Sequence, residues 1–177
     1  MARISVNPVG RVRSPYREYG VKRDRREVVS EIVLDEPYSD GLQGIEDFSH
    51  LHVIYWAHQA LLRRPSALLV HPAGRKDLGA VGVFASRSPN RPNRLCLSLV
   101  ELLERRGNVL RVKGLDAYDG SPVLDIKPYD LDDLVPHPKV PSWWLKLHGE
   151  PRRQRRGLSS RPSSTMTSSA TQRGRSK

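Results

Sequence analysis

The residues best suited to chemistry lie in four short stretches of the chain: 10–16, 44–59, 82–93 and 114–129. The last of these contains Asp119-Gly120-Ser121-Pro122, whose residue types are those of a tight turn, because Asp caps it, Gly accepts a positive φ angle and Pro stiffens the exit. Such a turn exposes backbone N–H and C=O groups that suit reading the edge of a purine. An ordinary hairpin turn has the same composition, so both interpretations stay open.

A second candidate is a loop that two prolines stiffen in the third stretch. It carries Arg87 and Arg91, with Asn90 and Asn93 as further polar side chains. A stiff loop presents guanidinium groups to a phosphate or a carboxylate with little ordering cost. An exposed loop with a purely structural role fits the same residues.

Metal binding and hydrolysis have little support. His50 and His52 lie two residues apart, on the same face of an expected strand, which is a ligand-like spacing. However, Cys96 is the only cysteine, so no cysteine-based zinc site and no intramolecular disulfide can form. The sequence contains neither the Gly-x-Ser-x-Gly elbow of a hydrolase nor the Gly-x-Gly turn of a Rossmann-type methyltransferase. We therefore expect no metal site.

Charge and hydrophobicity divide the chain near residue 150. Residues 151–177 contain eight basic residues, no acidic residue and no Ile, Val, Phe, Tyr or Trp. They supply +8 of the net charge of +11 and leave +3 for the body. We expect a disordered basic tail over 150–177, which polyanions attract. No signal peptide or membrane span is recognisable, so a soluble cytoplasmic protein is expected.

The elements that must position these residues are mostly short strands. Alternating or β-branched apolar runs predict strands near the following segments: 4–12, 28–34, 48–56, 67–70, 81–85, 94–103, 109–113 and 123–126. Residues 106–108 form a predicted hairpin turn, and a short helix is expected between Tyr38 and Ile45. The pattern indicates an all-β domain over 4–132, an antiparallel barrel or sandwich with short helices. The prolines and tryptophans of 133–149 predict an extended segment that docks on the body or on a partner.

Taken together, the four stretches resemble the TrmO family, also called TsaA-like or VirR-like. The shared patterns are Gly-x-x-x-Ser-Pro-Tyr at 10–16, Gly-Ile-Glu-x-Phe-Ser-His-Leu at 44–51, Gly-Val-Phe-Ala-x-Arg-Ser-Pro-x-Arg-Pro-Asn at 82–93 and Asp-Gly-Ser-Pro-Val-x-Asp-Ile-Lys-Pro-Tyr at 119–129. The resemblance implies a small, mostly antiparallel β-barrel that forms a homodimer and binds S-adenosyl-L-methionine near the subunit interface. It also implies methyl transfer to N6 of a threonylcarbamoyl-modified adenosine beside the tRNA anticodon.

Carried over position by position, the resemblance implies a set of cofactor contacts in this chain: Lys22, Arg23, Asp24, His58, Gln59, Arg87, Leu99, Tyr118, Asp119, Gly120 and Ser121. One departure is clear, because the family usually has Pro-Arg-Gln where this chain has Lys22-Arg23-Asp24. Either Asp24 meets the cofactor's amino group or sulfonium, or the register of this loop differs.

For the transfer itself, alignment and exclusion of water are the main tasks, and a nearby base would remove the proton of the target nitrogen. The candidates are Asp119, Asp125 and Tyr129, all in the fourth stretch, although Asp125 is also a possible partner of Lys127. Anticodon-loop bases splay outward more easily than duplex bases. The expected phosphate contacts are basic residues in or directly after the third stretch and in the tail: Arg91, Arg94, Arg152, Arg153, Arg155 and Arg156.

Two other functions remain open from the sequence. The altered loop at 22–24 would suit an RNA-binding barrel that has lost catalysis. A methyltransferase for another adenine-containing substrate would keep the same motifs. Binding of S-adenosyl-L-methionine separates the first of these from an enzyme.

Overall fold

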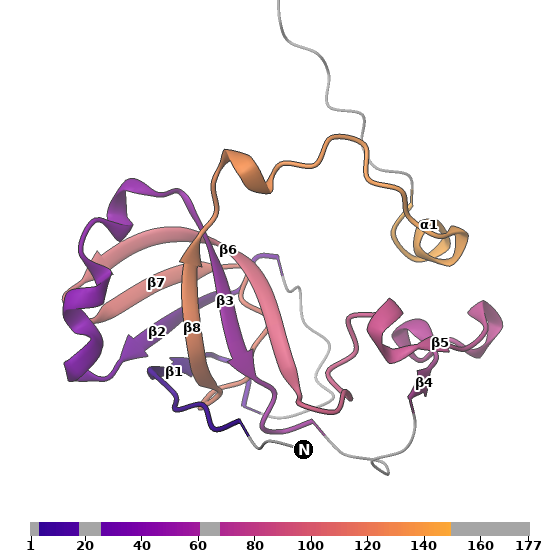
Figure 1. Ribbon diagram of the computed structural model, residues 1–177, viewed down its shortest axis with the longest axis horizontal. Helices are drawn as coiled ribbons and strands as arrows, with labels where there is room; N and C mark the ends of the chain where they lie inside the picture. Colours follow the sequence, from indigo (N-terminus) through magenta and orange to yellow (C-terminus); the bar gives the residue numbers. More distant parts are fainter. Residues whose placement is uncertain (1–3, 18–25, 61–67, 150–177) are drawn as a thin grey trace, which may run out of the picture.

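The computed structural model describes residues 4–17, 26–60 and 68–149. Six strands close into a barrel in the order β1-β2-β7-β6-β3-β8, and every neighbouring pair is antiparallel (Figure 1). Their bounds are β1 Gly10–Arg13, β2 Val29–Leu34, β3 His50–Trp56, β6 Leu95–Arg106, β7 Val109–Lys113 and β8 Pro122–Pro128. The predicted antiparallel barrel is confirmed.

The core fills the inside of the barrel because successive side chains of a strand point to opposite faces. Leu51, Val53 and Tyr55 share one side of β3, as their alternation predicts, and all three are buried. They pack with buried aliphatic side chains of the other strands, among them Ile32 and Leu110.

The first half of β6 turns its leucines outward. Leu95, Leu97 and Leu99 are 46%, 51% and 45% exposed. The pairing with β3 explains this, because the register joins Ser98 to the buried Val53 and so places the serine, rather than its leucine neighbours, inside the barrel.

Two glycines show where the backbone is constrained. Gly107 has φ +60 in the turn between β6 and β7, as the sequence predicts for 106–108. Gly10 allows β1 to approach β2 closely, since a Cβ atom at this position would lie 2.3 Å from the carbonyl oxygen of Val33. A glycine is therefore needed at position 10 because there is no room for a Cβ atom, and not because of its φ angle.

Residues 68–94 form an arm beside the barrel (Figure 1). It contains the two-stranded sheet of β4 Leu69–Val70 and β5 Val81–Gly82, with 3-10 helices at Pro72–Gly74, Lys76–Leu78 and Val83–Ala85. The strand predicted over 81–85 is therefore wrong in its second half. The chain turns there because the N–H and hydroxyl of Ser86 both donate to the carbonyl of Val83.

The remaining elements are short helices. The helix expected near 38–45 is present as two 3-10 helices, Glu36–Leu42 and Ile45–Asp47, which Gly44 separates at φ +80. After β8 come a 3-10 helix, Leu131–Asp133, and helix α1, Ser142–His148, which replaces the end of the expected extended segment. In the part of the chain described, no helix has the length and apolar character needed to cross a membrane.

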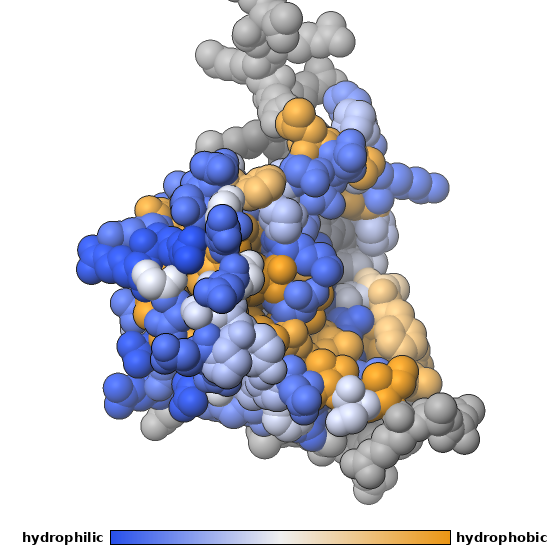
Figure 2. Space-filling view, turned by 60° about the vertical axis from the view of Figure 1, so that its left-hand side comes forward, coloured by the Kyte–Doolittle hydropathy of each residue, from blue (hydrophilic) through white to orange (hydrophobic). Residues whose placement is uncertain are grey.

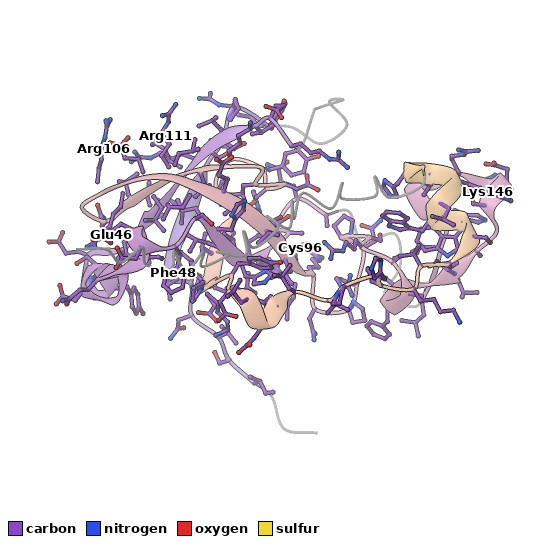
Figure 3. The ribbon with its side chains drawn as sticks, turned by 90° about the horizontal axis from the view of Figure 1, so that it is seen from above. Glu46, Phe48, Cys96, Arg106, Arg111 and Lys146 are labelled. Atoms are coloured by element: carbon purple, nitrogen blue, oxygen red, sulfur yellow. The ribbon has the colours of Figure 1, made fainter. Side chains whose placement is uncertain are left out.

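Helix α1 stands beside the arm (Figure 1). Arg75 lowers the pKa of the Asp77 carboxyl in the arm, and Lys146 of α1 contributes to the same shift. Figure 3 shows Lys146 far from the barrel. The expected tail, 150–177, lies outside the described residues.

Candidate active site

The turn 118–121 lies at one end of the barrel and joins the first and fourth motifs. Ser14 donates its backbone N–H to Oδ1 of Asp119 at 3.0 Å, and Asp119 donates its own N–H to the carbonyl of Tyr16 at 2.8 Å. Gly120 has φ +75, which is the glycine conformation expected for this turn. The segment after β1 and the turn before β8 therefore form one unit.

The second stretch, 44–59, reaches the same unit through His58 and Gln59. Nδ1 of His58 lies 3.2 Å from the buried hydroxyl of Ser121, and Gln59 donates its Nε2 to the carbonyl of Arg17 at 2.9 Å. Burial lowers the pKa of His58, while the charge of Asp119 acts in the opposite direction. The neutral imidazole is therefore favoured at neutral pH.

Tyr55 of β3, which is buried, and Cys96 of β6, which is half-buried, are neighbours across the two strands. Tyr55 donates its hydroxyl to the carbonyl of Asp116, and burial raises the pKa of that hydroxyl. Cys96 pairs with Tyr55 across β3 and β6, and its thiol pKa is raised, again mainly by burial. The alternation of β3 predicts Tyr55 on the same side as Leu51 and Val53, but nothing in the sequence linked it to Asp116.

Two of the cofactor contacts implied by the family lie elsewhere in the single chain. Leu99 points outward from β6, opposite His52. Arg87 is exposed and belongs to the arm, which in Figure 1 stands apart from the start of β8, where the turn lies. One chain thus brings together His58, Gln59 and the turn, but neither Arg87 nor Leu99.

The three candidate bases are spread along β8. Asp119 precedes the strand and Tyr129 follows it, and the strand alone spans about 20 Å at about 3.3 Å per residue. Asp125 pairs with Lys127 at 2.8 Å, the structural role that the sequence left open. Only Asp119 belongs to the turn.

Tyr129 packs instead on two histidines of β3. Its ring centroid is 5.5 Å from that of His52 and 6.3 Å from that of His50. His52 also lies 3.4 Å from a carboxylate oxygen of Asp133. Among the residues described, no three His, Cys, Asp or Glu side chains are grouped as metal ligands.

The expected phosphate contacts in the third motif and directly after it, Arg91 and Arg94, have structural partners. Nη1 of Arg91 donates to the carbonyls of Ser86 and Ser88, which holds its own loop together. The guanidinium of Arg94 lies over the ring of Trp56, 5.6 Å from the centroid. The other implied residues, Lys22, Arg23 and Asp24 of the cofactor loop and the tail arginines Arg152, Arg153, Arg155 and Arg156, lie outside the described residues.

Comparisons of the sequence and of the structure with known proteins agree on one family. Residues 12–132 match the family described as the tRNA-methyltransferase O N-terminal domain. A protein of Methanothermobacter thermautotrophicus named a probable S-adenosyl-L-methionine-binding protein is 46% identical over 136 residues, which cover 74% of this chain and 95% of that protein. One of Archaeoglobus fulgidus with the same name is 46% identical over 133 residues, 73% of this chain and 35% of that protein.

An Escherichia coli protein named tRNA (adenine(37)-N6)-methyltransferase is 39% identical over 141 residues, which cover 73% of this chain and 59% of that protein. The crystal structure of TrmO from Pseudomonas aeruginosa matches with a TM-score of 0.62 and 31% identity, over 78% of this chain and 61% of that one. The chain thus spans between about a third and nearly the whole length of the relatives it matches.

Proposed function

The chain belongs to the TrmO family, and we propose that it transfers a methyl group from S-adenosyl-L-methionine to N6 of a threonylcarbamoyl-modified adenosine beside the tRNA anticodon. The name of the Escherichia coli relative supports an adenine of tRNA as the target, and the archaeal names support the cofactor. The observation that carries the proposal is the convergence of Ser14, His58 and Asp119 from three of the four stretches at one end of the barrel.

The donor set at the turn fits a cofactor that combines adenosine with a sulfonium cation. The Asp119 carboxylate offers a counter-charge, and a neutral His58 adds no competing positive charge. Gly120 leaves the turn open, since a Cβ atom there would meet nothing within 4 Å. His58, Gln59, Tyr118, Asp119, Gly120 and Ser121 would hold the cofactor, which supplies an electrophilic methyl group when bound.

Asp119 is the candidate base that the turn favours. The target nitrogen belongs to a urea-like linkage whose delocalised lone pair makes it a poor nucleophile, so removal of its proton favours attack. Oδ1 of Asp119 accepts the Ser14 N–H, while Oδ2 has no hydrogen-bond donor among the described residues. Oδ2 is then the acceptor for that proton. Asp125 and Tyr129 would serve the same site only from a second chain.

The proposal includes a homodimer whose interface is the leucine face, formed by Ile54, Trp56, Leu95, Leu97 and Leu99 on the outside of β3 and β6. The register pairs Trp56 with Leu95 and Ile54 with Leu97, so the apolar side chains are contiguous. Figure 2 shows apolar side chains gathered on part of the molecular surface. Exposed patches of this kind mark interaction sites.

A second chain on the leucine face would also complete the cofactor site. Arg87 and Leu99 are exposed and distant from the turn of their own chain, yet the family resemblance implies that they contact the cofactor. In a homodimer, Arg87 and Leu99 of each subunit would lie next to the turn of the other subunit, and both residues could then contact the cofactor. Its place of action would be the cytoplasm, where tRNA is modified.

Mass analysis of tRNA nucleosides tests the reaction. The protein is incubated with isotopically labelled S-adenosyl-L-methionine and either threonylcarbamoyl-modified or unmodified tRNA. We expect the label only in the modified adenosine. Label in another nucleoside, or in a free adenine compound, would overturn the proposed substrate.

A non-catalytic RNA-binding barrel is the second candidate, and the altered Lys22-Arg23-Asp24 loop favours it. Calorimetric titration of S-adenosyl-L-methionine, with and without tRNA, separates the two. Binding of tRNA without any binding of the cofactor would support the non-catalytic barrel and contradict the proposed enzyme.

A further inference from the structure

An open cleft of about 530 Å³ lies against the turn that carries Asp119. Ser14 and Asp119 line it, and these residues are also joined by the hydrogen bond that holds the turn. The cleft therefore shares a wall with the proposed methylation site. Its volume is in the range of pockets that hold small ligands and exceeds what one free phosphate needs.

Three arginines, Arg13, Arg17 and Arg111, line this cleft. The register of three neighbouring strands places two of them, because Glu31 of β2 pairs with Arg13 of β1 on one side and with Arg111 of β7 on the other. With about 4.8 Å between adjacent strands, the two arginine backbones lie about 10 Å apart on the same outer face. Figure 3 shows Arg111 pointing away from the barrel, on the same side as Arg106.

Three arginines and two carboxylates, Glu31 and Asp119, line the cleft, so its positive charge is only partly balanced. Glu31 lies 3.6 Å from Arg13, but both side chains are largely exposed, and such surface pairs contribute little. Within the described residues, no carboxylate lies within ion-pair distance of Arg17 or Arg111. Two guanidinium groups are thus available to an anion.

We propose that this cleft binds a backbone phosphate of the RNA substrate, next to the nucleotide whose base enters the site at Asp119. The inference rests on the proposed function and adds an RNA contact on the barrel itself. Guanidinium groups bind phosphate oxygens through paired N–H donors. A single-stranded loop nucleotide held at its phosphate can turn its base toward the shared wall formed by Ser14 and Asp119.

The test compares Arg17→Ala and Arg111→Ala with Arg11→Ala in the full-length protein. Arg11 is a matched control, since it lies on the same outer face of β1, pairs with Asp35 at 3.9 Å and does not line the cleft. Affinity for a tRNA transcript is measured at several salt concentrations. Each cleft variant should lose about tenfold in affinity, the loss expected for a charge-assisted hydrogen bond.

The salt dependence gives a second readout. Removal of one phosphate interaction on a single strand should reduce the slope of log K against log salt by about 0.7, whereas Arg11→Ala should leave it nearly unchanged. Arg111→Lys should keep the slope but not the full affinity, because an ammonium group cannot bind in a bidentate manner. Thermal unfolding of each variant should match that of the unaltered protein.

Several results would overturn the inference. Equal losses in Arg11→Ala and Arg111→Ala would mean diffuse attraction rather than a site. Weaker S-adenosyl-L-methionine binding with unchanged tRNA affinity would assign the cleft to the cofactor carboxylate. Displacement of tRNA by inorganic phosphate beyond that caused by chloride at matched ionic strength would make it a site for free phosphate.

Failure of the cleft and failure of the proposed function are distinguishable. If the unaltered protein methylates tRNA and both cleft variants bind tRNA as tightly as it does, only the cleft inference fails. If the unaltered protein does not bind tRNA, the proposed function fails, and the phosphate site with it.

Discussion

The backbone N–H of Ser14 donates to Oδ1 of Asp119 at 3.0 Å, across 105 residues of sequence. This bond holds Oδ1 of Asp119 in place, whereas Oδ2 accepts no hydrogen bond from the described residues. It also connects the turn with the arginine-lined cleft, since both residues line that cleft. Asp119 is consequently the residue whose alteration should affect the most properties of the site.

Asp119→Asn should lower the pKa of His58 further, because the carboxylate charge raises this pKa while burial lowers it. Titration of the His58 ring by NMR measures the shift. The control is Asp125→Asn, whose carboxylate pairs with Lys127 and should leave His58 unchanged. A His58 pKa that stays constant or rises in Asp119→Asn would contradict the assigned electrostatics.

The lowered pKa of His58 makes the free energy of unfolding depend on pH. The folded pKa of His58 lies below its ordinary value of 6.5, so between these two values the unfolded chain binds more protons than the folded one. The contribution of His58 to stability is therefore present above pH 6.5 and is lost as the pH falls toward the folded pKa. Asp119→Asn should extend that loss to lower pH, and unfolding measured in denaturant across this range would detect it.

Arg87→Ala should weaken S-adenosyl-L-methionine binding about tenfold, as expected for one charge-assisted hydrogen bond. Because Arg87 is exposed, the thermal transition should hardly change. Arg75→Ala is the matched control, an exposed arginine of the same arm that pairs with Asp77 at 2.6 Å. An unaltered dissociation constant in Arg87→Ala would remove this residue from the site.

Light scattering should give a mass of about twice the 20.0 kDa of one chain. Leu97→Glu should shift the protein toward monomers, because it places a charge in the middle of the leucine face. Leu131→Glu is the control, since Leu131 is 82% exposed and lies outside that face. A monomer in the unaltered protein would contradict both the homodimer and a site shared between subunits.

Gly10→Ala should destabilise the fold by about 1–3 kcal/mol, the usual cost of overpacking. The new methyl group would lie 2.3 Å from the Val33 carbonyl oxygen, so β1 and β2 must separate. Gly41→Ala provides the comparison, because nothing lies within 4 Å of its Cβ position. Denaturant unfolding measures both, and similar values for the two variants would show that the close approach does not restrict Gly10.

Truncation after Glu150 should leave the fold and cofactor affinity intact, because the eight basic residues removed include none of the barrel. It should weaken tRNA binding and flatten its salt dependence, by about one unit of slope for each phosphate that the tail would otherwise neutralise. The same nucleoside should still be methylated. Identical salt slopes for the full-length and truncated proteins would show that the tail takes no part in binding.

The strands of the barrel are the part of the fold that the sequence predicts best. Leu51 and Val53 alternate with histidines because one face of β3 packs on the core, and this burial produces the pattern. Further along the strand the alternation is lost, since Ile54 and Trp56 on the outer face are also apolar. The same reasoning fails on β6, where the apolar residues of the alternation face outward. Periodicity shows that the two faces of a strand differ, but it does not show which face packs on the core of the same chain.

The candidate site was only partly predictable for a similar reason. The turn at Asp119 and Gly120 follows from local residue types, whereas its contact with Ser14 requires closure of the whole barrel. The grouping of Arg13 with Arg111 depends on the register of three strands, which no local pattern specifies. Helix α1 was also missed, since the prolines before it dominate the local signal.

Closure of the barrel also bears on aggregation. A sheet that closes on itself pairs most of its N–H and C=O groups, so little of it can be extended by another chain. Among the described residues, unpaired strand edges remain on β4 and β5, which have only two residues each, and on two parts of the barrel. Residues 95–100 of β6 pair only with β3, and residues 125–128 of β8 pair with β3 but not with β1. Backbone pairing between copies of this chain is therefore limited to these short edges, and the rest of the barrel can contact another copy only through side chains.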